Sequence, residues 1–210
     1  MSILSSKNIK LLAGPLNLQN PITVQVLGIC SALAVTVKLK PAIVMGISVT
    51  VVTAFSNLAI SYLRNYIPPR IRIIVQLVVV ATLVILVDQI LRAFVYDVSK
   101  QLSVYVGLII TNCIIMGRLE AFALGNEPGP SFVDGIGNGI GYTMILVIIA
   151  TIRELLGAGT LLGYQVIPAS FYEHGYVNNG MMLMPPMALI IVGSIIWIQR
   201  SWKKELVEHN

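Results

Sequence analysis

The sequence predicts an all-α membrane protein with six transmembrane helices, arranged as two inverted repeats of three helices each. The 210 residues are 56% hydrophobic and only 11% charged, with a mean hydropathy of +0.85. Soluble domains carry about 25% charged residues. The apolar residues gather in six segments separated by short polar turns. Two of these segments are short, and they occupy matching places in the two halves of the chain.

The composition excludes a soluble catalytic domain, because the longest connection between apolar segments, residues 154–180, has the length of a loop. We therefore expect one integral membrane domain over residues 1–210 and no activity from the isolated chain. The net charge of +5 is modest, and the basic residues stand singly at segment ends. This pattern is typical of topology anchors in membrane lipid and does not indicate nucleic-acid binding.

The first repeat, residues 1–98, begins with a polar lead-in over residues 1–20. The first apolar segment, Ile22–Val37, has 16 residues, fewer than the ~20 of a full crossing. Small and polar residues, including Cys30, lie near its middle. Pro41–Leu63 is a full span, and the Pro68-Pro69 turn that follows it cannot continue a helix.

The third predicted span is Ile73–Leu91. Asp88 near its end precedes Arg92 by four residues, the spacing of an intrahelical ion pair. The simpler interpretation of Asp88 is an ion pair at a solvent-facing helix end. The alternative is a carboxylate on a cation path through the membrane.

The second repeat, residues 99–210, follows a polar turn at residues 96–101 and opens with a second short segment, Val104–Gly117. Thr111-Asn112-Cys113 in its middle predicts an interrupted helix. A break at Gly125–Pro130 then precedes the fifth span, Asp134–Ile152. The sixth span is predicted over Met181–Gln199, with Pro185-Pro186 in its first turn and Trp197 and Trp202 at its far end as interface anchors.

The fifth segment contains two interleaved glycine pairs, Gly135/Gly139 and Gly137/Gly141. Such spacing lets another backbone approach a membrane helix closely. A phosphate-binding glycine loop would need a preceding strand and a βαβ unit, and neither is predicted here. Asn138 is expected to form a hydrogen bond with a neighbouring helix.

The predicted topology places both termini in the cytoplasm. Most of the 14 basic residues fall on the side of the N-terminus, the second and fourth turns and the tail, as the positive-inside rule requires. Lys38 and Lys40 fall on the opposite side.

Each short segment carries one of the two cysteines, Cys30 and Cys113. On composition alone, two buried thiols that merely pack would be the simpler interpretation. Three spans per repeat is an odd number, however, so the two halves have opposite orientations. Paired interrupted segments then point to a site at the midplane, where the cysteines would meet. This arrangement favours metal ligation.

Soft thiolates select zinc, copper(I) or iron–sulfur centres, and a closed site uses four thiolates. This chain supplies two, so a related six-span partner would supply the others. A structural zinc in the middle of the membrane has no evident role. An iron–sulfur centre there would relay electrons across the bilayer.

The chain resembles the D-subunit family of the bacterial sodium-translocating NADH:quinone oxidoreductase over nearly its whole length. The run Ser99–Ala123, which contains Thr111-Asn112-Cys113, carries the resemblance, together with Gln25–Val35, Ile74–Gln76, Asp88–Leu91 and Asp134–Gly139. The block Thr111–Arg118 is shared with the Rnf ferredoxin:NAD oxidoreductase. An Rnf-type subunit is therefore an alternative.

The resemblance implies a six-subunit complex in the bacterial inner membrane that reduces ubiquinone and exports Na⁺. Electrons would pass from NADH to FAD and a [2Fe-2S] centre in the F subunit, then to covalent FMN in the C and B subunits, and on through riboflavin. The other partners are the A subunit and the E subunit, a homologous six-helix protein of opposite topology. In this family the D and E subunits share a [2Fe-2S] centre, and its ligands here would be Cys30 and Cys113.

Two further interpretations assign the chain to other classes of protein. A secondary transporter with inverted repeats would use Asn112, Asp88 and Asn138 as substrate or ion contacts. A structural scaffold would pack cofactor-bearing subunits through its glycine pairs. Iron analysis of the complex before and after mutation of the cysteines separates these alternatives from an electron carrier.

Overall fold

The structure, a computed structural model, describes residues 11, 12, 14, 15, 19–94, 105–165 and 179–202. Helices make up nearly all of the ordered elements, with one small hairpin between them. Most of the predicted lead-in, the turn at residues 96–101 and the tail after Trp202 lie outside the described residues.

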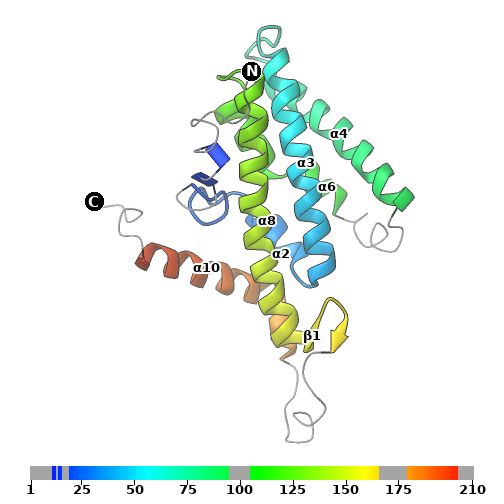
Figure 1. The fold of residues 1–210 in the computed structure, drawn as a ribbon, viewed down its shortest axis with the longest axis vertical. Helices are drawn as coiled ribbons and strands as arrows, with labels where there is room; N and C mark the ends of the chain where they lie inside the picture. The colour runs from blue at the N-terminus through cyan, green and yellow to red at the C-terminus, as the bar shows by residue number, and fades with distance from the viewer. Residues whose placement is uncertain (1–10, 13, 16–18, 95–104, 166–178, 203–210) are drawn as a thin grey trace, which may run out of the picture.

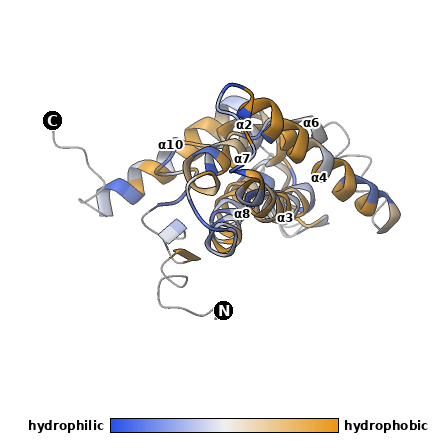
Figure 2. Ribbon diagram, turned by 90° about the horizontal axis from the view of Figure 1, so that it is seen from above, coloured by the Kyte–Doolittle hydropathy of each residue, from blue (hydrophilic) through white to orange (hydrophobic). Residues whose placement is uncertain are grey.

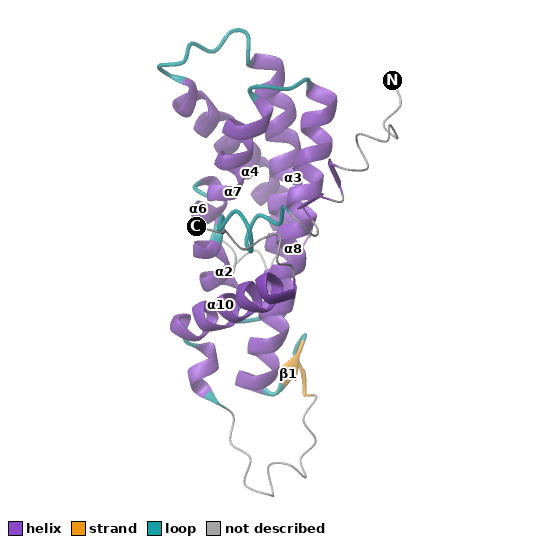
Figure 3. Ribbon diagram, turned by 90° about the vertical axis from the view of Figure 1, so that its left-hand side faces the viewer, coloured by secondary structure: helices purple, strands orange, loops and turns teal. Residues whose placement is uncertain are grey.

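Two long antiparallel helices, α3 (Leu39–Leu63) and α8 (Pro128–Ala158), lie side by side along the long axis of the molecule (Figures 1 and 3). α8 carries proline in its first turn, where a helix needs no backbone donor. It ends at Gly159, whose left-handed conformation with φ of 68° closes the helix. The predicted break therefore ends at Glu127, and Pro128 and Pro130 start the helix.

Small residues bring α3 and α8 close together. A Cβ atom on Gly139 would lie 2.6 Å from the Cα of Thr50, and one on Gly135 would lie 2.7 Å from the Cα of Ala54. Neither separation is possible for a real side chain, so both glycines are needed at this crossing. The prediction that this pair admits a neighbouring backbone is confirmed.

The second glycine pair faces a different part of the chain. A Cβ atom on Gly137 would lie 2.9 Å from the carbonyl oxygen of Leu11, and one on Gly141 would lie 2.7 Å from that of Pro15. The N-terminal segment therefore packs against the side of α8, which uses its two glycine pairs for two different neighbours.

Both short segments are interrupted, as predicted. The first forms only α2 (Ile29–Val35), and the residues before it are not helical. The second forms α6 (Val106–Ile110), a break at Thr111 and Asn112, and then α7 (Cys113–Arg118), which continues as the π-helix η1 (Leu119–Ala123). α2 and α6 lie near the middle of the long axis (Figures 1 and 3).

A third long helix, α4 (Arg72–Phe94), packs against α3 and leaves a wide apolar face uncovered (Figure 2). Its exposed apolar side chains are Ile73, Ile74, Val78, Ile85, Leu86 and Ile90. Among the described residues, three helices are long and apolar enough to cross a membrane, at residues 39–63, 72–93 and 128–158. These helices correspond to the second, third and fifth predicted spans.

The sixth predicted span begins later than expected. Residues Gly180–Leu183 form the 3₁₀-helix η2, and α10 (Pro185–Trp202) begins at the proline pair. α10 runs across the axis of α3 and α8 (Figure 1), and it is not among the three helices that meet the length and apolarity of a span. The sixth crossing therefore stays a prediction.

A short hairpin follows α8 and was not predicted. β1 (Thr160–Leu161) pairs antiparallel with β2 (Tyr164–Gln165). Both turn residues have positive φ, 55° for Leu162 and 90° for Gly163, which is the backbone that a two-residue hairpin turn needs.

Candidate metal centre

Cys30 is held at the start of α2. Gly28 caps the helix in the left-handed conformation, with φ of 78°, and its carbonyl oxygen accepts the first helical hydrogen bond, from the N–H of Ala32 at 3.1 Å. Val26 also has a positive φ, 58°, which is rare for a β-branched residue. Two sharp backbone reversals therefore lead into the helix and place Cys30 in its first turn.

Cys113 is the first residue of α7. Asn112 caps this helix, because its side-chain oxygen accepts a hydrogen bond from the N–H of Ile114 at 3.2 Å. The polar step therefore separates two short helices, since Thr111 ends α6 and Asn112 starts α7. Both cysteines lie at the beginnings of short helices.

The two helix starts meet. The Cys30 and Cys113 thiols lie close enough to interact electrostatically with one another, and both cysteines are exposed at the surface. Behind them, a Cβ atom on Gly28 would lie 2.7 Å from the Cδ1 of Ile114. The sequence-based expectation that these cysteines approach each other agrees with this geometry.

A layer of buried polar side chains lies directly beneath the thiols. The Ser31 hydroxyl lies 2.6 Å from the Tyr142 hydroxyl, and the Asn112 amide nitrogen lies 3.5 Å from the same Ser31 oxygen. All three side chains have no exposed surface. The sequence analysis missed Ser31 and Tyr142 as parts of the site, although each places a hydroxyl within an apolar stretch.

The far end of α2 is fixed by Arg153, which has no exposed surface. Its guanidinium donates to the Thr36 hydroxyl at 2.6 Å and to the Leu33 carbonyl at 3.3 Å. It also donates to the carbonyl oxygens of Met182 at 3.0 Å and Leu183 at 2.9 Å, in η2. α8 therefore holds α2 at both ends, through Tyr142 and Arg153.

Asp88 and Asn138 lie in other surroundings. The predicted ion pair of Asp88 with Arg92 is confirmed, at 3.0 Å. Asp88 does not face solvent as expected, because its side chain is largely buried. The expectation that Asn138 bonds to a neighbouring helix is wrong, because its amide nitrogen donates to the carbonyl and carboxylate of Asp134 in its own helix. Asn112 lies beside the thiol pair, where its side chain caps α7 and reaches Ser31. Each of the three proposed transporter residues therefore has a different neighbourhood.

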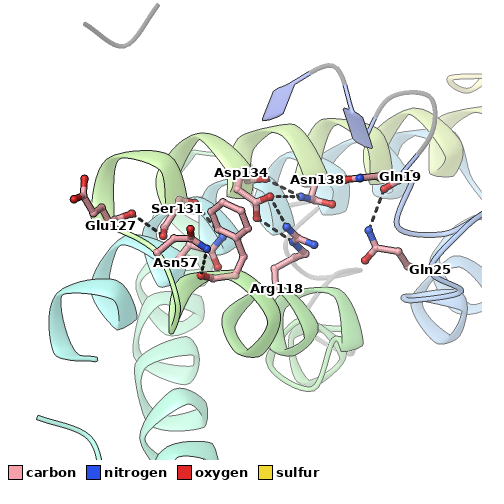
Figure 4. A network of polar contacts seen from close by, with 10 residues as sticks. Gln19, Gln25, Asn57, Arg118, Glu127, Ser131, Asp134 and Asn138 are labelled. Carbon is pink, nitrogen blue, oxygen red and sulfur yellow. Dashed lines mark hydrogen bonds and ion pairs between the residues drawn. The ribbon is translucent and has the colours of Figure 1, made fainter. Parts of the chain in front are cut away.

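An ion pair that the sequence analysis missed joins the end of α7 to α8. The Arg118 guanidinium binds both carboxylate oxygens of Asp134, with its Nε 2.9 Å from Oδ2 (Figure 4). The Cζ atom of Arg118 also lies 5.4 Å from the centre of the Phe122 ring. Asp134 is the only acidic residue in the predicted fifth span. A single carboxylate in an apolar span was the sequence signal for this ion pair.

Among the described residues, the cysteine pair has no third ligand from this chain. Within the part of the chain that the structure describes, no group of three or more His, Cys, Asp or Glu side chains could hold a metal ion. Two adjacent, exposed thiols with no further ligand fit one half of a four-thiolate centre, because the remaining ligands can come only from outside.

These features define a helical membrane protein in which two interrupted helices present a pair of thiols at one surface. The chain belongs to the Rnf-Nqr family: the family profile described as "Rnf-Nqr subunit, membrane protein" matches residues 8–196.

Three relatives show how close the match is. A Haemophilus ducreyi protein is 59% identical, over 95% of this chain and 96% of the relative. A Neisseria gonorrhoeae protein is 60% identical, over 90% and 91%. A Psychromonas ingrahamii protein is 56% identical, over 94% of both chains. Each bears the name of the D subunit of Na(+)-translocating NADH-quinone reductase.

Proposed function

We propose that this chain is the D-type membrane subunit of a Na⁺-translocating NADH:ubiquinone reductase, and that Cys30 and Cys113 provide two of the four thiolates of a [2Fe-2S] centre. The observation that carries the proposal is the closeness of the two thiols at the starts of α2 and α7. Relatives that are 54–60% identical and bear the name of this subunit support it.

The other two ligands would come from a homologous six-helix E subunit, and the A, B, C and F subunits with their FAD, FMN and riboflavin would complete the complex. The exposure of both thiols supports this arrangement, because a partner can reach them. When bound, a [2Fe-2S] centre accepts and releases one electron at a time. The part of this chain is to provide the two sulfur ligands and to fix where they lie in the membrane.

The proposed inverted repeat, residues 1–98 and 99–210, is supported by the crossing of α3 and α8. Both helices contain a glycine followed four residues later by a threonine, Gly46 and Thr50 in α3 and Gly139 and Thr143 in α8. Gly46 lies against Thr143, and Gly139 lies against Thr50. A two-fold axis relating the helices produces reciprocal contacts of this kind.

The subunit would lie in the bacterial inner membrane with both termini in the cytoplasm. Under that topology, the α3–α4 turn and the Arg118–Asp134 ion pair are at the cytoplasmic end, and the hairpin after α8 is at the opposite end. The thiol pair lies between the two ends, where an electron carrier that crosses the bilayer would be needed.

The test is iron analysis of the purified complex with Cys30→Ala and Cys113→Ala. Each variant should lose the share of iron, acid-labile sulfide and visible absorption that belongs to this centre, and with it quinone reduction. The iron of the F subunit should remain, and NADH oxidation by artificial acceptors should continue. Thr111→Val, which changes an exposed neighbour of Cys113, should keep the iron. Unchanged iron and sodium-stimulated quinone reduction in Cys113→Ala would contradict the proposal.

A further inference from the structure

We propose that Ser31, Asn112 and Tyr142 are positioning residues, which hold the Cys30 and Cys113 sulfurs at the separation and orientation that a shared iron–sulfur centre requires. The inference rests on the proposed function and goes beyond it, because these three residues are not ligands of the centre themselves. They act through the backbone and through the cysteines beside them in the sequence.

The Ser31 hydroxyl is the centre of this arrangement. It donates to the carbonyl oxygen of Gly28 at 2.8 Å, so its single proton is already used. The Tyr142 hydroxyl, 2.6 Å away, must therefore donate to Ser31. The Asn112 amide nitrogen provides a second donor at 3.5 Å. Ser31 thus uses its full capacity of one donor and two acceptor positions.

Asn112 joins the two helix starts. Its side-chain oxygen caps α7 through the N–H of Ile114, and its side-chain nitrogen reaches across to Ser31 in α2. Ser31 follows Cys30 directly, and Asn112 precedes Cys113 directly. Each link is therefore one residue from a thiol, and a shift in either link moves a sulfur.

Tyr142 attaches the two helix starts to the long helix α8. The glycine contacts hold α8 against α3. The three polar side chains are fully buried, whereas both cysteines are exposed. A buried polar group that loses its partner costs ~1–3 kcal/mol. Any motion that separates the helix starts meets this cost, so the buried layer restrains the exposed thiols.

The experiment compares two single-oxygen deletions, Tyr142→Phe and Ser31→Ala, in the purified complex. Tyr62→Phe is the matched control, because Tyr62 lies in α3 and is 66% exposed. Tyr142→Phe and Ser31→Ala should change the electron paramagnetic resonance spectrum and the midpoint potential of the reduced centre. Tyr62→Phe should leave both as in the parent.

A second measurement does not need the iron. The complex is depleted of iron with a chelator and treated with phenylarsine oxide, which bridges two thiols only when they lie close together, and adduct formation is followed by the mass of this chain. Capture should be severalfold slower in Tyr142→Phe and in Ser31→Ala. The double variant should match Ser31→Ala, because the Tyr142 hydroxyl has already lost its serine partner in that variant.

The outcomes separate the two proposals. Parental spectra and parental capture rates in both variants would overturn the positioning role, while loss of iron in Cys30→Ala would leave the proposed function standing. Iron retained in Cys30→Ala would instead overturn the proposed function, and the capture rates would then decide the positioning role alone. If Tyr142→Phe fails to assemble, Ser31→Ala provides both measurements.

Discussion

The hydroxyl oxygens of Thr50 in α3 and Thr143 in α8 lie 3.3 Å apart. Each hydroxyl also donates to the carbonyl oxygen four residues earlier, at 2.8 Å, and each threonine rests against a glycine of the opposite helix. Without a hydrophobic effect between helices in lipid, close packing of this kind is the main source of their attraction. The centre of the molecule is thus a tight helix crossing.

Gly139→Ala should destabilise this crossing. The new methyl group would lie 2.6 Å from the Cα of Thr50, a backbone atom that can move only with its helix. Overpacking of this kind typically costs ~1–3 kcal/mol. The thermal unfolding midpoint of the purified complex should fall. Gly193→Ala in α10, where a Cβ would meet nothing within 4 Å, should leave it unchanged, and equal midpoints for the two variants would contradict the prediction.

Gly28→Ala should weaken the thiol site more than it weakens the fold. Its left-handed backbone costs an L-residue ~1–2 kcal/mol, and its Cβ would press on Ile114 at 2.7 Å and Tyr142 at 3.2 Å. The iron content of the complex should therefore fall. Gly107→Ala in α6 adds a methyl group in open space, and it should retain parental iron. Parental iron content in Gly28→Ala would argue against close packing of the two helix starts.

Arg118→Met and Asp134→Leu should each be strongly destabilising on their own, by ~3–5 kcal/mol, because each leaves a charge unpaired and largely buried. The double variant should recover a substantial part of the loss. Unfolding midpoints of the two single variants and the double variant measure this coupling. Simple additivity of the two single effects would show that the ion pair does not stabilise this end of the protein.

Arg153→Met should loosen both α2 and η2. The guanidinium satisfies four carbonyl oxygens and one hydroxyl, all neutral. Its removal leaves buried acceptors unpaired at ~1–3 kcal/mol each, so the yield and thermal stability of the complex should both drop. Arg200→Met, at an exposed position in α10, is the control and should have little effect.

Much of the architecture could be predicted from residue patterns. The step Thr111-Asn112-Cys113 predicted the interruption of the second short segment, because polar groups cap helices and rarely continue through apolar runs. The proline pair at 185–186 predicted the first turn of the last helix. The start of α8 was missed because Pro128 and Pro130 look like breaks, although proline is tolerated where no backbone donor is needed.

The surroundings of the thiols were less predictable. Cys30 and Cys113 could be paired through the repeat alone, but Tyr142 lies 29 residues beyond Cys113 and reaches Ser31 only because α8 packs beside α2. The partnership of Arg118 with Asp134 depends in the same way on how the end of α7 meets α8. Asn138 was assigned to a neighbouring helix because helical spacing does not reveal that a residue four positions earlier offers it two acceptors.

The unequal lengths of the helices have a dynamic consequence. α3 and α8 have 25 and 31 residues and share a continuous contact, whereas α2, α6 and α7 have only seven, five and six. Local opening is easiest where few cooperative hydrogen bonds must break. Amide hydrogens of α3 and α8 should therefore exchange with deuterium last and those of α2 and α6 first. A shift in the cysteine-bearing turns need not disturb the long helices.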